Sequence, residues 1–489
     1  MTMTTGEIAE LLDEPLGAMP DLPFSSVTAD SRKIERGGLF VALQGEKVDG
    51  HDFAEQARAK GAVAVLGERE GQTDLGGLPY IFVKSARRAL GLTAHALQDN
   101  PSRALKVIGV TGTNGKSSTV FLLRRILETC GLSTAQLGTL GYTIGDVTLD
   151  AAHTTPFPED LATMFRSAKD AGQTHVVMEV SSHALEQERV AGIDFDAAVF
   201  TNLTQDHLDY HESMEAYLIE KLKLFEAVRG EDAFTVVNNE DPYAGRFAEV
   251  SSAPCHRYGL GGDVRALDVR VEARATSYRV VSPWGAEDIT MNLLGLHNVS
   301  NALAAITVCG ALGLPMPCIA RGVEALTSVP GRFERIDVGQ DFQVIVDYAH
   351  TEDGLRNVLQ AAREICTGRV IVVFGCGGDR DRGKRPKMAS VAAELADYCI
   401  VTSDNPRTES PERIVLDVVV GLQQAGKKPG DEYSVFVDRV EAIRHALDAA
   451  RPGDLVMIAG KGHEDYQIIN SERIHFDDRE VARNLLQAM

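Results

Sequence analysis

Residues Val107–Thr119 have the sequence VIGVTGTNGKSST, and this stretch decides how the chain around it folds. A short apolar run enters a turn that contains Gly112 and Gly115, and Lys116 then opens an amphipathic helix. A strand, a glycine-rich loop and a helix in this order are typical of a phosphate-binding loop, in which backbone N–H groups, the helix N-terminus and a lysine surround phosphate oxygens. The usual consensus has a glycine where this chain has Val110. A plain glycine turn is the alternative, but the flanking strand and helix favour a phosphate site.

The composition predicts a globular protein of several domains. With 489 residues the chain is too long for a single core and corresponds to about three domains. Hydrophobic residues make up 44% and charged residues 24%, which is ordinary for a globular protein. The formal net charge of -21 argues against nucleic acid as a partner, because most of the surface repels a polyanion. Anionic small molecules must therefore be bound by locally concentrated donors.

The N-terminal stretch and the cysteines indicate a cellular compartment. The start, MTMTTGEIAELLDEPL, has neither the basic nor the apolar region of a targeting signal, and no apolar run approaches the roughly twenty residues of a membrane span. We therefore expect a cytoplasmic protein. The seven cysteines are scattered, odd in number and without a CxxC pair, which favours reduced thiols over disulfides or a zinc cluster.

Short apolar runs alternate with helical stretches near the N-terminus, which predicts a small α/β domain over residues 1–102. Within it, the polar segment that contains Ser31, Glu46 and Lys47 is dense in turn formers and hydrogen-bond donors. Such a segment either binds a ligand or forms a set of solvated loops, and the local pattern does not distinguish the two.

Residues 103–331 alternate strands and helices, as a mostly parallel sheet requires, and ligands bind such sheets at the carboxyl ends of the strands. Glu179 ends one apolar strand and His207 follows another, so both reach a metal beside the phosphate loop if their strands flank its strand. Taken singly, a surface carboxylate and a solvated helix face would be the better interpretations, but the phosphate loop favours the metal site. Lys221 lies in a predicted helix over residues 214–227, and the pattern gives it no special role.

The alternation restarts after Gly331, which predicts a second doubly wound domain over residues 332–489. Several of its strands end in polar residues, and one is followed by a glycine turn with five basic residues. In a chain this acidic, cationic groups at strand ends suggest recognition of a carboxylate or a phosphate. A solvated basic loop is the alternative.

The motifs of the chain resemble those of the Mur ligases, the ATP-dependent enzymes that add amino acids to the peptidoglycan precursor. In order they are TGTNGKSS, MEVSSHAL, TNLTQDHLDYH, GLHNVSNALAA, GRFERI, DYAHT, GCGGDRDRGKRPK, SDNPRTE and AGKGHE. The resemblance covers nearly the whole chain and implies an α/β protein of three domains. These are a small N-terminal domain for a UDP-linked precursor, a central P-loop ATPase domain with a mostly parallel sheet, and a C-terminal Rossmann-like domain that binds the amino acid.

Within the family, the resemblance is to the members that add meso-diaminopimelate, and it implies a reaction. ATP phosphorylates the D-glutamate γ-carboxylate of UDP-N-acetylmuramoyl-L-alanyl-D-glutamate, here called the UDP-dipeptide. The amine of diaminopimelate attacks the acyl phosphate, and phosphate leaves to give the amide. Catalysis of this kind is mostly alignment and charge neutralisation. The implied partners are these small molecules, with no nucleic acid and no membrane, and we expect a monomer.

Carried over position by position, the resemblance implies four groups of site residues. Those expected at ATP are Gly112, Thr113, Asn114, Gly115, Lys116, Ser117, Ser118, Asn301, Arg332 and Asp347. Those expected at Mg²⁺ are Ser117, Glu179, His207 and Lys221, the last as a carbamylated lysine, and with Lys116 the last three are the expected catalytic residues. Those expected at the UDP-dipeptide are Ser31, Glu46, Lys47, Thr154, Thr155, Ser181, Gln187 and Arg189. Those expected at diaminopimelate are Arg380, Asp404, Asn405, Pro406, Arg407, Gly460 and Glu464.

The sequence DNPR, which ends in Arg407, is expected to select the amino acid. Diaminopimelate has a second carboxylate that Arg407 can pair, whereas lysine would leave the arginine desolvated and unpaired, so discrimination by ~10⁴ is attainable. Lysine-adding relatives lack this arginine. The chain departs from the family at three positions: Glu352 replaces a usual proline, Arg382 a common lysine and His153 a frequent asparagine. These departures concern local contacts, with the chemistry left intact.

Three other functions compete with this prediction. Folylpolyglutamate synthetase and a lysine-adding Mur ligase use related chemistry, and the DNPR sequence and the N-terminal UDP-type segment argue against both. A catalytically silent nucleotide-binding regulator would keep the phosphate loop alone. The presence of Glu179, His207 and Lys221 together with Lys116 argues against it.

Overall fold

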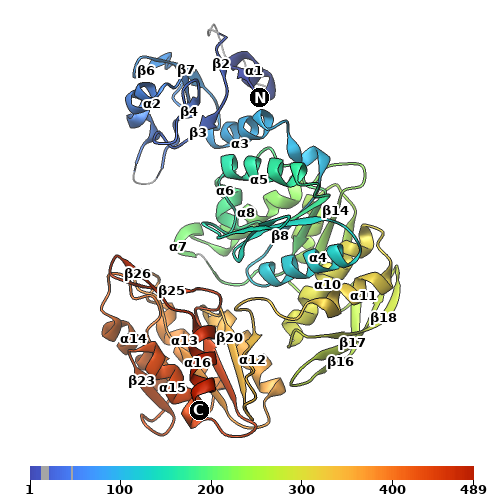
Figure 1. Ribbon diagram of the computed structural model, residues 1–489, viewed down its shortest axis with the longest axis vertical. Helices are drawn as coiled ribbons and strands as arrows, with labels where there is room; N and C mark the ends of the chain where they lie inside the picture. The colour runs from blue at the N-terminus through green and yellow to red at the C-terminus, as the bar shows by residue number, and fades with distance from the viewer. Residues whose placement is uncertain (13–20, 46–47, 207) are drawn as a thin grey trace.

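A computed structural model describes residues 1–12, 21–45, 48–206 and 208–489 as three α/β regions that follow one another along the chain (Figure 1). Each region has its own main sheet, the three main sheets share no strand, and three smaller antiparallel sheets complete the described part of the chain. The fold class and the three-region organisation predicted from the sequence are confirmed. The predicted boundaries at residues 102 and 331 remain predictions. In the described part of the chain, no helix combines the length and the apolarity needed to cross a bilayer.

The N-terminal region is a small sheet with helices on both sides. Its elements are β1 (Met3–Thr4), α1 (Thr5–Leu12), β2 (Pro23–Phe24), β3 (Val27–Thr28), β4 (Leu39–Val41), η1 (Gly50–Phe53), α2 (Ala54–Lys60), β5 (Ala64–Gly67), β6 (Asp74–Leu75), β7 (Leu78–Phe82) and α3 (Ala86–Leu97). Five of the strands pair in the order β3-β4-β5-β7-β6, in which only β6 is antiparallel, and β1 and β2 form a separate antiparallel pair. Ser85 caps α3 by accepting a hydrogen bond from the Arg88 N–H.

The central region is built on an eight-stranded sheet in the order β11-β10-β9-β12-β8-β13-β14-β15. Its elements are η2 (Pro101–Ala104), β8 (Lys106–Thr111), α4 (Lys116–Thr129), β9 (Thr134–Gly138), β10 (Gly141–Ile144), β11 (Val147–Leu149), α5 (Pro158–Asp170), β12 (His175–Glu179), α6 (Ser182–Glu186), β13 (Ala197–Phe200), α7 (Leu208–His211), α8 (Met214–Glu226), β14 (Phe234–Asn238), α9 (Ala244–Val250), β15 (Cys255–Tyr258), β16 (Arg265–Val271), β17 (Thr276–Ser282), β18 (Gly285–Met291), α10 (Leu296–Ala311) and α11 (Met316–Ala325). Strands β9, β12, β8, β13, β14 and β15 are parallel, and β10 and β11 extend the sheet as an antiparallel edge.

Alternate side chains of β8 point into different cores, because the side chains of a strand alternate between the two faces of its sheet. Ile108 and Val110 pack with α4, α10 and α11 on one face. Val107 packs with α5 and α8 on the other face. Both faces are therefore covered, which explains the continuous apolar run in the sequence.

The C-terminal region has a six-stranded sheet in the order β19-β20-β24-β21-β22-β23, parallel except for β19. Its elements are β19 (Glu334–Arg335), β20 (Gln343–Asp347), α12 (Glu352–Ile365), β21 (Val370–Phe374), α13 (Lys384–Leu395), β22 (Tyr398–Thr402), α14 (Pro411–Gln424), β23 (Tyr433–Phe436), α15 (Arg439–Ala449), β24 (Leu455–Ala459), β25 (Tyr466–Ile469), β26 (Glu472–His475) and α16 (Asp478–Ala488). Helices α12, α13 and α14 cover one face of the sheet, and α15 and α16 cover the other.

The cysteine prediction is wrong for one pair. Cys130, directly after α4, forms a disulfide with Cys318 in α11, and their Cα atoms lie 5.7 Å apart. The two residues are 188 positions apart, so no local spacing in the sequence could predict the pair. The packing of α11 on α4 brings them together. The other five cysteines are free thiols, as predicted.

Candidate functional site

The phosphate loop lies between β8 and α4, and the residues that follow β13 contact it. A Cβ on Gly112, whose φ is +146°, would lie 1.9 Å from the Thr201 Oγ1, so only glycine fits there. Thr201 donates a hydrogen bond to the Asn114 carbonyl at 2.6 Å, and the Asn114 N–H donates to the Asn202 side chain at 2.9 Å. Val110, by contrast, is buried within β8. The glycine that the loop requires therefore stands at position 112.

Lys116 opens α4 and folds back over the phosphate loop. Its Nζ donates to the Gly112 carbonyl at 2.9 Å and to the Thr113 carbonyl at 2.7 Å. Burial lowers the pKa of this amine, and the nearby Glu179 carboxylate opposes that shift. The ammonium lies at the N-terminus of α4, where phosphate oxygens are favoured.

Glu179 ends β12 beside the loop and is almost fully buried. Its Oε1 accepts hydrogen bonds from the Ser117 hydroxyl and the Thr139 N–H, both at 2.9 Å. The strand that ends in Glu179 lies beside the strand of the phosphate loop, as the metal-site prediction requires, because β12 and β13 flank β8 on its two sides. A hydroxyl and a carboxylate are oxygen ligands of the kind that Mg²⁺ prefers. His207 lies outside the described residues.

Metal-binding chemistry at this point would need phosphate oxygens or water as further ligands. Within the described ranges, no group of three or more His, Cys, Asp and Glu side chains is arranged to hold a metal ion. Ser117 and Glu179 supply an oxygen pair, which fits an ion that is shared with a bound nucleotide.

Lys221 is buried in α8 and faces the phosphate loop. Its Nζ donates to the Gly112 carbonyl at 2.9 Å and lies 4.5 Å from the centre of the Tyr217 ring. Burial first, and then the charge of Lys116, lower the pKa of Lys221 well below its ordinary value. The uncharged form of this amine is therefore favoured relative to that of an exposed lysine.

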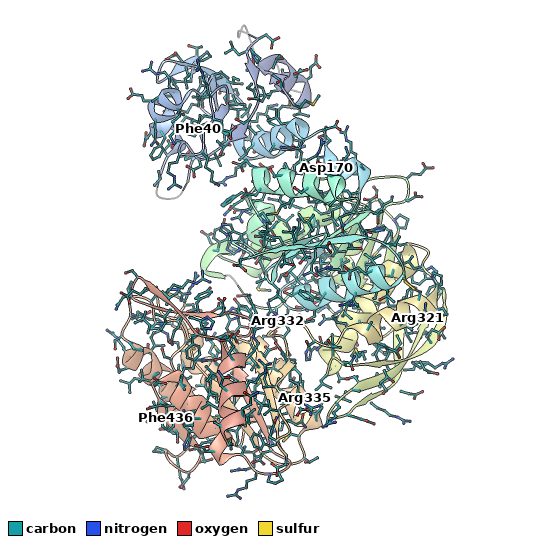
Figure 2. The ribbon with its side chains drawn as sticks, viewed as in Figure 1. Phe40, Asp170, Arg321, Arg332, Arg335 and Phe436 are labelled. Atoms are coloured by element: carbon teal, nitrogen blue, oxygen red, sulfur yellow. A yellow bond between two sulfur atoms is a disulfide. The ribbon has the colours of Figure 1, made fainter. Side chains whose placement is uncertain are left out.

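A cavity of about 340 Å³ extends from the phosphate loop to the C-terminal region. Arg332 lies where the two regions meet (Figure 2); its guanidinium stacks 4.4 Å from the Tyr348 ring centre and donates to the Ser117 hydroxyl at 3.4 Å. Asp347 accepts 2.7 Å hydrogen bonds from two backbone N–H groups, and burial raises its pKa. The predicted ATP residues that line this cavity are Thr113, Asn114, Gly115, Lys116, Ser117, Ser118, Asn301, Arg332 and Asp347. Gly112 does not line it.

A second cavity, of about 1060 Å³, lies between the N-terminal and central regions. Of the residues predicted for the UDP-dipeptide, Ser31, Gln187 and Arg189 line it. The Arg189 guanidinium stacks 4.4 Å from the Phe157 ring centre and donates to the Thr155 carbonyl at 2.9 Å. Glu46 and Lys47 lie outside the described residues.

A third cavity, of about 900 Å³, lies between the central and C-terminal regions. The residues predicted for diaminopimelate that line it are Arg380, Asp404, Asn405, Arg407, Gly460 and Glu464, whereas Pro406 does not. Three residues predicted for the UDP-dipeptide, Thr154, Thr155 and Ser181, line this cavity as well.

The three cavities share walls. Arg189 lines both the 1060 Å³ and the 900 Å³ cavities. Thr154 and Ser181 line both the 900 Å³ cavity and the 340 Å³ cavity at the phosphate loop. The 900 Å³ cavity thus adjoins both of the others, the 1060 Å³ cavity at Arg189 and the 340 Å³ cavity at Thr154 and Ser181.

Comparison with known proteins gives a consistent result along the chain. Family models match residues 23–102 (Mur ligase family, catalytic domain), 110–309 (Mur ligase middle domain) and 331–462 (Mur ligase, glutamate ligase domain). A relative from Syntrophomonas wolfei, named UDP-N-acetylmuramoyl-L-alanyl-D-glutamate--2,6-diaminopimelate ligase, is 45% identical over 98% of this chain and 97% of its own. The chain belongs to the Mur ligase family. A Geobacter metallireducens relative of the same name is 46% identical over 94% of this chain and 93% of its own.

Solved structures agree with this assignment. A structure titled UDP-N-acetylmuramoyl-L-alanyl-D-glutamate--2,6-diaminopimelate ligase is 34% identical, has a TM-score of 0.72 and covers 100% of this chain and 99% of its own. A folylpolyglutamate synthase of Mycobacterium tuberculosis is 20% identical over 76% of this chain with a TM-score of 0.62, so it shares the fold alone. As a member of the family, this Mur ligase is an amide-forming enzyme, which confirms the predicted class.

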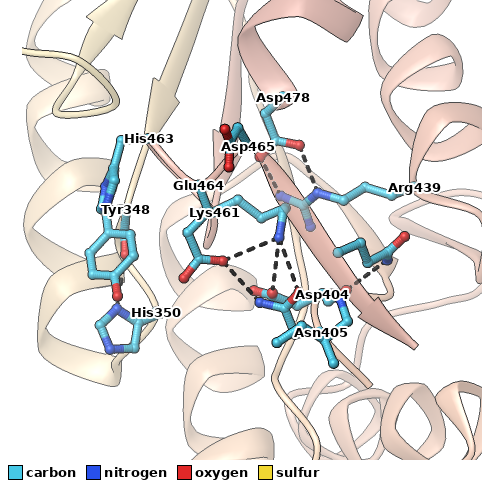
Figure 3. Close-up of polar contacts among 12 residues, drawn as sticks. Tyr348, His350, Asp404, Asn405, Arg439, Lys461, His463, Glu464, Asp465 and Asp478 are labelled. Atoms are coloured by element: carbon cyan, nitrogen blue, oxygen red, sulfur yellow. Dashed lines mark hydrogen bonds and ion pairs between the residues drawn. The ribbon is translucent and has the colours of Figure 1, made fainter. Parts of the chain in front are cut away.

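Lys461, a buried lysine of this Mur ligase, lies at the end of β24; the sequence indicated it only as one of several cationic groups at strand ends. Figure 3 shows Lys461 among three residues predicted for diaminopimelate. Its Nζ lies 3.2 Å from the Glu464 Oε2, 3.3 Å from the Asn405 Oδ1 and 3.8 Å from the Asp404 Oδ1. The Asn405 amide also donates to Glu464 at 2.9 Å. Even so, burial raises the pKa of Glu464. For Lys461, the only signal in the sequence was a basic residue at the end of a predicted strand.

Asp353 was also missed, although it connects the C-terminal region to the phosphate loop. Its Oδ2 accepts hydrogen bonds of 3.0 Å from both the Asn114 side chain and the Thr204 hydroxyl. Two of the three departures from the family, Glu352 and His153, line the 900 Å³ cavity. The third, Arg382, donates a hydrogen bond to Glu409 at 2.7 Å.

Proposed function

We propose that this Mur ligase adds meso-diaminopimelate to the D-glutamate γ-carboxylate of the UDP-dipeptide, with ATP as co-substrate. One observation carries the proposal: the 900 Å³ cavity shares Arg189 with the 1060 Å³ cavity and shares Thr154 and Ser181 with the 340 Å³ cavity, so it connects the other two. A reaction of three substrates needs this arrangement, because the acceptor carboxylate must reach first a phosphate and then an amine. The names of the relatives and of the 34% identical structure support the same reaction.

The chemistry takes place in two steps. A γ-carboxylate oxygen of the UDP-dipeptide attacks the terminal phosphorus of ATP, and the bond to the bridging oxygen breaks to release ADP. The amine of diaminopimelate then attacks the carbonyl carbon of the acyl phosphate and loses a proton, and inorganic phosphate leaves. Lys116 and Arg332 place positive charge beside the phosphate loop, where negative charge shifts during transfer.

We assign Mg²⁺ to Ser117, Glu179 and His207, with Lys221 as a further ligand after carbamylation. The ion would neutralise phosphate charge. An uncharged amine is the form that adds CO₂, releasing a proton and giving a carbamate anion. The lowered pKa of the buried Lys221 supports this assignment.

For the amino acid, we assign the distal carboxylate of diaminopimelate to Arg380 and Arg407 and the distal ammonium to Asp404 and Glu464. Both pairs line one cavity, so a zwitterionic end group would meet charges of both signs. Lysine has the ammonium without the carboxylate and would leave Arg407 unpaired.

The deciding experiment measures ADP release by the purified protein with ATP and the UDP-dipeptide, titrated separately with diaminopimelate and lysine. We expect release that depends on diaminopimelate. A preference for lysine would support the lysine-adding alternative, and no release with any amino acid would support the regulator. Lys116→Met should abolish release, whereas Lys169→Met, on the surface of α5, is the matched control.

We also propose that the protein is a cytoplasmic monomer. ATP and the nucleotide-linked precursor are cytoplasmic molecules, and the three cavities are formed by a single chain. Light scattering of the purified protein tests the second point, with 52.8 kDa expected for a monomer.

A further inference from the structure

Two loops that carry the arginines of the 900 Å³ cavity are joined to each other outside it. The loop after β21 contains Arg380, and the loop after β22 contains Arg407. Gly378 and Pro406 bring the two backbones into contact, since a Cβ on Gly378 would lie 1.9 Å from the Pro406 carbonyl oxygen. The spacing of the two arginines therefore depends on how these loops are held.

Two acidic side chains, each bound to donors beyond its own loop, hold the loops together; we call the side chains at positions 379, 382, 385, 408 and 409 the loop clamp. Asp379, in the first loop, accepts hydrogen bonds from the Thr408 N–H at 3.1 Å and from its hydroxyl at 2.8 Å. Glu409, in the second loop, accepts from the Asp379 N–H at 2.7 Å, from Arg382 at 2.7 Å and from Arg385 at 2.8 Å. Each loop thus supplies a carboxylate to donors on the other.

The clamp includes a fully buried cation. The Arg385 side chain has no exposed surface and pairs with Glu409 and, at 2.9 Å, with Asp417 of α14. A buried guanidinium fixes geometry strongly, because its planar fork of N–H groups can donate to carboxylates in only a few orientations. Arg382, which stands where the family usually has lysine, donates a hydrogen bond to the same Glu409 carboxylate.

The backbone at both ends of the clamp is also unusual. Asp379 has φ +54° and Arg407 has φ +53°, in the left-handed region that residues with a side chain rarely adopt. Arg407 is held there by its N–H, which donates to the Ile468 carbonyl, and by its carbonyl, which accepts from the Asn470 N–H. Conformations of this kind persist only where surrounding contacts determine them.

We infer that the loop clamp positions Arg380 and Arg407 for the second carboxylate of the amino-acid substrate and so determines its selection. The five clamp side chains, at positions 379, 382, 385, 408 and 409, do not line the cavity. They act through the two arginines, and none contacts the substrate. The inference rests on the proposed function.

The test compares Glu409→Gln with Glu412→Gln, the same change at an exposed position three residues away whose side chain contacts Ser410. We expect Glu409→Gln to raise the KM for diaminopimelate by roughly ten- to one-hundred-fold. The KM for ATP should stay within about twofold, since the clamp lies outside the nucleotide cavity. The preference for diaminopimelate over lysine should fall by about the same factor as the KM rises.

A second pair of variants tests the inference if the Glu409→Gln protein does not fold. Thr408→Val removes the hydroxyl that reaches Asp379, and Thr408→Ser keeps it. We expect the KM for diaminopimelate to rise in the valine variant and to stay unchanged in the serine variant. Equal KM values for diaminopimelate in the folded variants and the wild type would overturn the inference. So would a KM for ATP that rises as much as that for diaminopimelate. If wild-type protein releases no ADP with diaminopimelate, the proposed function has failed instead.

Discussion

Breaking the ion pair between Arg439 and Asp478 should open the substrate-facing end of the C-terminal sheet. Both side chains are fully buried, and Asp478 accepts two hydrogen bonds from the guanidinium, at 2.8 Å and 2.7 Å. The same guanidinium donates to the carbonyls of Ser403 and Ala459, each the residue before a predicted substrate contact. The pair therefore joins the ends of β22 and β24.

The free-energy cost of breaking this ion pair can be worked out from its contacts. Asp478→Ala leaves a buried guanidinium without its carboxylate, which costs about 3–5 kcal/mol. Two hydrogen bonds to a charged group, at about 1.5–3 kcal/mol each, give a similar figure. In the double variant Arg439→Met/Asp478→Leu the charges disappear together, and the main remaining cost is two unpaired carbonyls at about 1–3 kcal/mol each. The effects of the two substitutions should therefore be less than additive.

The assay must report on the C-terminal region alone, because a protein of several domains is not expected to unfold in one step. The single tryptophan, Trp284, lies between β17 and β18 in the central region, so its fluorescence does not serve. Amide hydrogen exchange of peptides covering residues 399–404 and 455–460 reports directly on the ends of β22 and β24. We expect exchange there to accelerate by about 100-fold or more in Asp478→Ala. Acceleration below about tenfold, or strict additivity in the double variant, would refute the reasoning.

Three further predictions concern chemistry, selectivity and oxidation state. Lys221→Ala should abolish phosphate release even in excess bicarbonate, and near-normal release would contradict the carbamate assignment. Arg407→Ala should raise the KM for diaminopimelate roughly 100-fold, the equivalent of about 3 kcal/mol, and leave that for ATP nearly constant; equal changes in both would count against its role. Reductant should lower the melting temperature, because the bond between Cys130 and Cys318 closes a long loop worth about 4 kcal/mol or more in the chain-entropy model. Equal melting temperatures with and without reductant would show that the bond contributes nothing.

Local patterns predicted the elements and the ends of strands where polar residues gather. The phosphate loop is an example: its strand, glycines and helix are contiguous, and the structure has β8 and α4 as the pattern predicts. The alternation of strand and helix also placed Glu179 beside that loop, because parallel strands end at the same edge. Information of this kind lies within about ten to twenty residues of sequence.

Contacts between distant segments were beyond such patterns. Asp353 reaches Asn114 across 239 positions, and Cys130 reaches Cys318 across 188. The burial of Lys461 depends on β22, β24 and β25 converging around it, which no local period encodes. The resemblance to the family, by contrast, named Lys221, because it carries information about position that the helix pattern lacks.

The distribution of the site over two sheets has a functional consequence. Carboxyl ends of strands from the central and C-terminal regions face the same cavities, so neither region alone surrounds the reacting atoms. Arg332 reaches Ser117 from the C-terminal side at 3.4 Å, and Asp353 reaches Asn114 at 3.0 Å. These two contacts are polar, whereas Leu294 of the central region packs into the core of the C-terminal region. We therefore expect the central region to hold phosphate by itself, and we expect acyl transfer to an amine to require contact between the central and C-terminal regions.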